Sequence, residues 1–185
     1  KKAFDLYNKG IIDIKDIPDE IKLNFKQKVQ KDAVVNNKKF IAKEEIKKFI
    51  SKLEYPLYFL DFETFNVAIP LFEGQKPYQQ IPFQYSLHVQ ETLGSSLVHH
   101  SYLGKGKKDY RKEFMSDLKG VMGDSGSIIV YNQSFEKRIL RETAQHLVEF
   151  EDWVESIVGR MVDLADPFKA FYWYCPSQQG KYSIK

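Results

Sequence analysis

Two acidic residues, with one residue between them, stand in the apolar segment LYFLDFETF at residues 57–65. Residues two apart on a β-strand point to the same face, so Asp61 and Glu63 could bind one ion together. Carboxylate oxygens suit Mg²⁺ or Mn²⁺, and no Cys or His stands near the pair to favour zinc. Two carboxylates at the end of a buried strand repel each other unless a cation or a proton intervenes. The pair therefore indicates a metal site, although such a triplet also occurs by chance in many proteins.

A second segment, IIVYNQSFEKRIL at residues 128–140, reads as an apolar strand, an Asn and the start of a helix. Ser134 is expected to cap this helix, which places Glu136 in its first turn. Two interpretations of Glu136 follow: a carboxylate favoured by the helix dipole, or a third metal ligand brought against the end of the first strand. Asn132 ends its strand where open α/β sheets bind ligands, so it is expected to orient Glu136 or to contact substrate.

The elements that must position these residues begin after a change of composition at Tyr55. Apolar patterns predict strands over 57–60, 83–90, 97–103, 127–131 and 161–164, helices over 109–122 and 135–150, and a long ordered loop over 66–82. Three antiparallel strands followed by alternating helices and parallel strands predict an α/β fold with a ribonuclease-H-like mixed sheet. Other α/β sheets fit this order nearly as well.

Residues 1–54 are predicted to form a small helical subdomain before a domain over 55–185. This lead-in holds 14 Lys/Arg and 9 Asp/Glu, a net charge of +5, whereas residues 55–185 have a net charge of −2. A basic lead-in beside an acidic body suits nucleic-acid binding, and a lysine-rich solvated helical face explains it equally well. The segment around Gly10 resembles a helix-hairpin-helix faintly, and a small packing subdomain is the favoured interpretation.

The composition also bears on the compartment. No run of 18 apolar residues is present, which excludes a transmembrane helix and argues against a membrane partner. The single cysteine, Cys175, cannot form an internal disulfide, so a reducing cytoplasm is expected.

Together the two acidic segments resemble the DEDD-type 3′–5′ exonucleases, whose motifs are Asp-x-Glu-Thr and Asn-x-x-Phe-Asp. Here the motifs read DFET at 61–64 and NQSFE at 132–136. More closely, the chain is similar to an uncharacterised bacterial family, a domain of unknown function that often follows a RecB-like nuclease domain. The residues carrying this similarity are 55–65 (YPLYFLDFETF), 69–70, 77–88 (PYQQIPFQYSLH), 126–136, 160–164 and 180–185.

The resemblance implies a metal-dependent nuclease that hydrolyses phosphodiester bonds of DNA or RNA by a two-metal mechanism, with Mg²⁺ or Mn²⁺ as cofactor. Asp61 would bind both ions, Glu63 one and Glu136 the other. The resemblance also implies an N-terminal RecB-like nuclease domain in the same polypeptide. The residues expected to contact substrate are Thr64, Asn132 and Lys185.

The chain departs from the exonuclease pattern in two ways. Glu136 stands where those enzymes carry Asp, and the third motif, a Tyr or His followed by Asp on a late helix, has no counterpart before Lys185. The nuclease domain is therefore expected to be truncated here. Asp163, on the fifth strand, is a candidate for either a structural acid or a metal ligand. The alternative function is a catalytically inactive nuclease-fold module that binds nucleic acid or docks a partner nuclease domain.

Overall fold

The computed structural model describes residues 2–183, which form two compact units. One unit combines residues 2–51 with residues 165–183, and the other is the continuous segment Lys52–Leu164, which carries the acidic motifs. The sequence predicts a single domain over 55–185. The structure instead groups residues 165–183 with the N-terminal segment, because the two-residue strands β1 (Phe40–Ile41) and β7 (Trp173–Tyr174) pair antiparallel.

The first unit is mainly helical. Its helices are α1 (Lys2–Tyr7), α2 (Phe25–Asn36), α3 (Lys43–Ile50) and α7 (Asp166–Lys169), with 3₁₀ turns at Ile14–Asp16 and Pro176–Gln178. Asn24 begins α2 because its side chain accepts the Gln27 N–H while the Gln27 side chain accepts the Asn24 N–H. A small core of Val29, Ala33, Phe171 and Tyr174 holds α2 against the β7 region.

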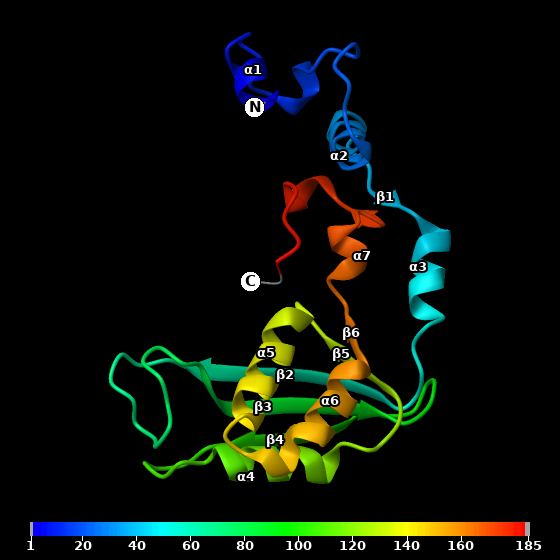
Figure 1. Cartoon of the computed structure of the whole chain (residues 1–185). Coiled ribbons are helices and arrows are strands. Elements are labelled where there is room, and N and C mark those ends of the chain that lie inside the picture. Colours follow the sequence, from blue (N-terminus) through cyan, green and yellow to red (C-terminus); the bar gives the residue numbers. More distant parts are fainter. Residues whose placement is uncertain (1, 184–185) are drawn as a thin grey trace. The chain divides into compact units, whose positions relative to one another are not determined.

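The second unit is built on a five-stranded mixed sheet (Figure 1). Its strands are β2 (Leu57–Phe65), β3 (Ile81–Gln90), β4 (Val98–Leu103), β5 (Ser127–Val130) and β6 (Met161–Asp163). The spatial order is β4-β3-β2-β5-β6. Neighbours among β2, β3 and β4 run antiparallel, whereas β5 is parallel to both β2 and β6. The predicted mixed α/β sheet is confirmed.

Three helices, α4 (Arg111–Val121), α5 (Gln133–Ala144) and α6 (Glu151–Gly159), share one core with the sheet. Alternate strand residues supply the sheet's part of this core: Tyr58, Leu60, Phe62, Tyr85, Leu87, Val89, Ile128, Val130 and Met161. The predicted single helix over 135–150 is wrong. Leu147, with φ −141°, leaves the helical conformation, and this break lets Phe150 enter the core before α6 begins. No helix within residues 2–183 is long and apolar enough to cross a membrane.

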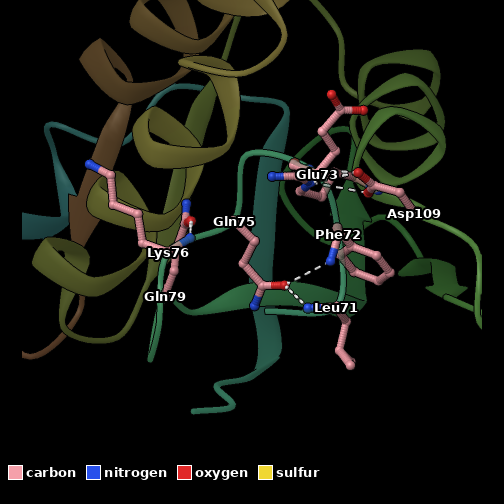
Figure 2. A network of polar contacts seen from close by, with 8 residues as sticks. Leu71, Phe72, Glu73, Gln75, Lys76, Gln79 and Asp109 are labelled. Carbon is pink, nitrogen blue, oxygen red and sulfur yellow. Dashed lines mark hydrogen bonds and ion pairs between the residues drawn. The ribbon is translucent and has the colours of Figure 1, made fainter. Parts of the chain in front are cut away.

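The loop between β2 and β3 is ordered by its own side chains (Figure 2). The Gln75 side chain is buried, and its Oε1 accepts the backbone N–H groups of Leu71 at 2.9 Å and Phe72 at 3.2 Å. Arg111, only 5% exposed, donates to the Glu73 carbonyl at 2.8 Å and pairs with Asp109 at 2.6 Å. Partial burial opposes ionisation of Asp109, but the hydrogen bonds and charge of Arg111 hold its pKa below the usual value. The loop is therefore braced against the start of α4.

Candidate functional site

Asp61 and Glu63 lie on β2 with exposed side chains, alternating with the buried side chains of Leu60 and Phe62. The two carboxylates thus share the sheet face that points away from the helical core, as their spacing predicts. On the neighbouring strand β3, Asp61 is opposite Ser86 and Glu63 is opposite Gln84. The register shifts directly after Glu63, so the regular pairing of β2 with β3 is interrupted next to the acidic pair.

The parallel strands bring further polar groups to the same edge of the sheet. Phe59 of β2 is paired with Ile129 of β5, and Val130 of β5 is paired with Asp163 of β6. The parallel pairing of β2 with β5 ends at Phe59, and Asp61 follows two residues later on β2. After β5 ends at Val130, the chain enters α5 at Gln133. The carboxyl ends of parallel strands are where open α/β sheets bind ligands.

Glu136, in the first turn of α5, is buried: only 3% of the residue is exposed. Its Oε2 has no hydrogen-bond partner among residues 2–183. Burial raises the pKa of Glu136 to about 7; a backbone hydrogen bond at the helix start opposes this rise, and the nearby charges of Asp61 and Asp163 add to it. Glu136 therefore experiences the negative charges of Asp61 and Asp163, and its Oε2 is a buried carboxylate oxygen without a partner.

Asp163 holds the start of α5. The residue is 2% exposed, and its two carboxylate oxygens accept the backbone N–H groups of Asn132 at 2.8 Å and Gln133 at 3.2 Å. These N–H groups precede the first helical hydrogen bonds and would otherwise be unsatisfied. The predicted cap, Ser134, is wrong, because Ser134 lies inside α5 and its hydroxyl donates to the Asn132 side chain at 3.1 Å.

Replacing Asp163 with Ala should lower the free energy of unfolding by about 2 kcal/mol, because two partly buried backbone N–H groups lose a charged acceptor. Urea unfolding of the chain measures this change. Asp124→Ala, at an exposed loop position of the same unit, is the control and should have little effect. A loss for Asp163→Ala no larger than that of the control would contradict the capping role.

The residues predicted to contact substrate have different surroundings. The Thr64 hydroxyl accepts a hydrogen bond from Gln80 Nε2 at 3.3 Å. Asn132 has φ +71°, a left-handed conformation that Asn tolerates better than most residues, at the junction of β5 and α5. Lys185 lies outside the described residues. These three roles stay predictions.

Within residues 2–183, no group of three or more His, Cys, Asp or Glu side chains is gathered closely enough to hold a metal ion. Asp61 and Glu63 are exposed on β2, whereas Glu136 is enclosed at the start of α5. The chemistry of the donors nevertheless fits a hard divalent cation, since all are carboxylates and one has an unpartnered buried oxygen. A cation near Glu136 would favour its ionised form and offset the repulsion from Asp61 and Asp163.

The sequence indicates Gln79, Gln80 and Gln84 as residues that could contact a substrate, but sequence reasoning missed Arg138, which contacts Gln80. Arg138 of α5 hydrogen-bonds with Gln80 of the β2–β3 loop, and Gln80 in turn contacts Thr64 beside the acidic pair. No local motif indicates the contact between Gln80 and Arg138, because these residues are 58 positions apart in the sequence. The signals available in the sequence were the glutamines of the β2–β3 loop and the positively charged Arg138 on α5.

A family model described as a domain of unknown function, DUF2779, matches residues 58–183. The chain belongs to this family. The prediction that the chain is a member of an uncharacterised bacterial domain family is thereby confirmed. The DUF2779 match begins within β2 and runs through both acidic segments and β6 into the helical unit.

The DUF2779 chain is also similar to three uncharacterized proteins of Mycoplasma and Ureaplasma species. It is 34% identical over 143 residues to the uncharacterized protein MG366 homolog of Mycoplasma pneumoniae, covering 72% of the chain and 21% of that protein. It is 29% identical over 161 residues to the uncharacterized protein MG366 of Mycoplasma genitalium, covering 80% and 24%. The uncharacterized protein UU173 of Ureaplasma parvum is 31% identical over 146 residues, with coverage of 73% and 21%.

The chain thus spans less than a quarter of the length of these curated relatives. No solved structure matches the chain.

Proposed function

We propose that the Lys52–Leu164 unit is the core of a metal-dependent nuclease with a ribonuclease-H-like fold. The observation that carries this proposal is the buried carboxylate of Glu136, whose Oε2 has no hydrogen-bond partner and which is influenced by the charge of Asp61 beyond the parallel pairing of β2 with β5. The strand order β4-β3-β2-β5-β6, with β4, β3 and β2 antiparallel and β5 and β6 parallel, supports the fold assignment. A buried carboxylate oxygen without a partner favours a functional role for Glu136, since burying such an oxygen is costly.

Asp61, Glu63 and Glu136 are the residues that would hold Mg²⁺ or Mn²⁺. When bound, such ions lower the pKa of a coordinated water and stabilise the leaving oxygen of a phosphodiester. Glu136 binds a cation only after losing its proton, and its raised pKa makes that step strongly pH-dependent near neutrality. Asp163, engaged with two backbone N–H groups, positions α5 and hence Glu136.

The substrate proposed is nucleic acid, with the phosphodiester bond placed over the exposed acidic face of β2. Thr64 adjoins this face, and its hydroxyl is held by Gln80. A RecB-like nuclease domain in the same polypeptide is the proposed partner, on the strength of the family resemblance.

A nuclease assay of the full-length protein in Mn²⁺ tests the proposal, on single- and double-stranded DNA and RNA, with Asp61→Asn beside the wild type. Wild-type hydrolysis that Asp61→Asn abolishes is the expected result, because Asn lacks the charge that binds the cation. Equal activity of the two proteins, or no activity on any of the four substrates, would overturn it.

An inactive binding module is the second candidate, favoured by one observation: the acidic side chains of residues 2–183 are not gathered into a three-ligand group. Calorimetric titration with Mn²⁺ separates the two functions. A nuclease should show a site that Asp61→Asn removes, whereas a module that has lost catalysis should show no difference between the two proteins.

A further inference from the structure

A cavity of about 700 Å³ opens between the β2–β3 loop and the outer face of α5. The loop contributes Asn66 and the continuous segment from Lys76 to Gln80. The helix and the turn after it contribute Arg138, Glu142, Gln145 and His146. Every one of these residues belongs to the Lys52–Leu164 unit. A cavity of this size could take one nucleotide.

The charged groups of the cavity favour an anion. Lys76 and Arg138 are positive and Glu142 is negative, which leaves one net positive charge with His146 neutral. Glu142 pairs with Arg138 at 3.3 Å, and Arg138 also hydrogen-bonds with Gln80. Within residues 2–183 no ion pair is formed by Lys76, so its charge is available to a ligand.

Tyr78 stands at the rim in a backbone conformation that its side chain disfavours. The Gln79 N–H donates to the Lys76 carbonyl at 3.1 Å, and Pro77 and Tyr78 are the central residues of this turn. Pro in the first central position and φ +59° in the second define a type II turn, which normally carries Gly or Asn where Tyr78 stands. A bulky residue with positive φ is a strained exception, and such strain concentrates at binding sites. Tyr78 is 67% exposed, so core packing does not explain this conformation.

The wall that carries Lys76 and Tyr78 is preformed. Gln79 Oε1 accepts the Lys76 N–H at 2.9 Å, and the Tyr78 N–H donates to the Val67 carbonyl at 2.8 Å (Figure 2 shows the Lys76–Gln79 contact). Next to this wall, Gly74 has φ +71°, and a Cβ there would lie 3.3 Å from His146 Nδ1. The loop backbone therefore comes close to the end of α5, and binding would not have to order it.

The two elements that carry the acidic residues also lead into the cavity. Asn66 is three residues beyond Glu63, about 10 Å along an extended chain. Arg138 is two residues beyond Glu136 on α5, a rise of about 3 Å, and its side chain lies on a different face of the helix from the buried Glu136. A strand of nucleic acid lying over the carboxylates would thus reach the cavity within a few nucleotides.

We propose that this cavity binds one nucleotide of a single-stranded nucleic acid, next to the phosphodiester at the carboxylates. Lys76 and Arg138 contact its phosphate, and the ring of Tyr78 stacks on its base. The inference rests on the proposed function, because it names the form of nucleic acid that the same site receives.

Fluorescence anisotropy with labelled decathymidylate and decauridylate, in EDTA, tests the cavity without any metal. Tyr78→Gly should weaken binding about tenfold, because an aromatic platform for the base is lost. Tyr78→Phe, which keeps the ring and the strained turn, should bind like the wild type. Lys76→Gln should weaken binding and reduce the slope of log K against log salt concentration by about 0.7, whereas Lys107→Gln, at an exposed loop lysine, should leave both unchanged.

Thermal unfolding of the same variants separates binding from folding. Glycine tolerates positive φ, so Tyr78→Gly should melt at or slightly above the temperature of the wild type. Normal affinity of Tyr78→Gly and Lys76→Gln for both oligonucleotides, or no binding by the wild type, would overturn the cavity assignment. Because these measurements contain no metal, that result is distinct from a failure of Asp61-dependent hydrolysis, which would overturn the proposed nuclease and not the cavity. The two oligonucleotides report whether DNA or RNA is preferred.

Discussion

Replacing Glu136 with Gln should lower Mn²⁺-dependent hydrolysis of nucleic acid by about 100- to 1000-fold and, at pH 8 without metal, stabilise the chain by up to about 3 kcal/mol. Activity falls and stability rises for the same reason, which is the loss of the negative charge at position 136. Glu136 is 3% exposed with an unpartnered Oε2, and its charge is disfavoured by burial and by Asp61 and Asp163. Gln has the same shape without the charge, so it relieves the repulsion and cannot serve as an anionic ligand.

Activity of the full-length protein and urea unfolding of the chain measure the two effects. Glu151→Gln is a matched control, since Glu151 is an exposed glutamate in the first turn of α6 and should affect neither quantity. A Glu136→Gln protein with normal hydrolysis would remove Glu136 from the site. One that loses stability together with activity would make Glu136 a structural residue.

The stability of the wild-type chain should fall by up to about 3 kcal/mol as pH rises from about 4.5 to about 7, relative to Glu136→Gln. The usual pKa of 4.5 applies to Glu136 in the unfolded chain, and burial raises the value in the folded chain to about 7. Between these values the folded state holds a proton that the unfolded state has released, so the free energy of unfolding decreases with rising pH. The contribution is complete below the lower pKa and is lost above the higher one.

Urea unfolding of both proteins at pH 5, 6, 7 and 8 gives this difference directly. The difference in free energy of unfolding between the two proteins should be smallest at pH 5 and should increase toward pH 8. Mn²⁺ at pH 8 should recover part of the wild-type loss and none of the loss in an Asp61→Asn background, because a bound cation stabilises the ionised carboxylates. A constant difference between wild type and Glu136→Gln across this range would contradict a raised pKa at Glu136.

The strand that carries Asp61 and Glu63 was predictable from local pattern. Side-chain direction on a strand depends on the backbone alone. An apolar run that contains two acidic residues at positions i and i+2 therefore indicates a strand with both acidic side chains on one face. The order of strands and helices also followed from short apolar runs separated by turn residues, and the five strands are found where they were expected. Two strands are longer than predicted: β2 continues to Phe65 beyond the predicted 57–60, and β3 begins at Ile81 rather than at residue 83.

The helix after β5 shows where local pattern failed. Apolar spacing continued to Phe150, but α5 ends at Ala144 and a separate helix, α6, follows. The break places Phe150 in the core that α6 shares with the sheet. The stabilisation from burying Phe150 depends on residues far away in the sequence. Ser134 is a residue type that commonly caps helices. The oxygens that accept the N–H groups at the start of α5 instead belong to Asp163, 31 residues from Asn132.

By itself, the sequence determined which carboxylates lie on a strand, which one opens a helix, and the order along the chain of the five strands of the larger sheet. Only the tertiary structure decided that Glu136 is enclosed near Asp61 and Asp163 while Asp61 and Glu63 stay exposed. It also decided that Lys76, Tyr78 and Arg138 line one cavity. Burial, electrostatic influence and cavity walls depend on groups far apart in the chain, so no local spacing of residue types can specify them.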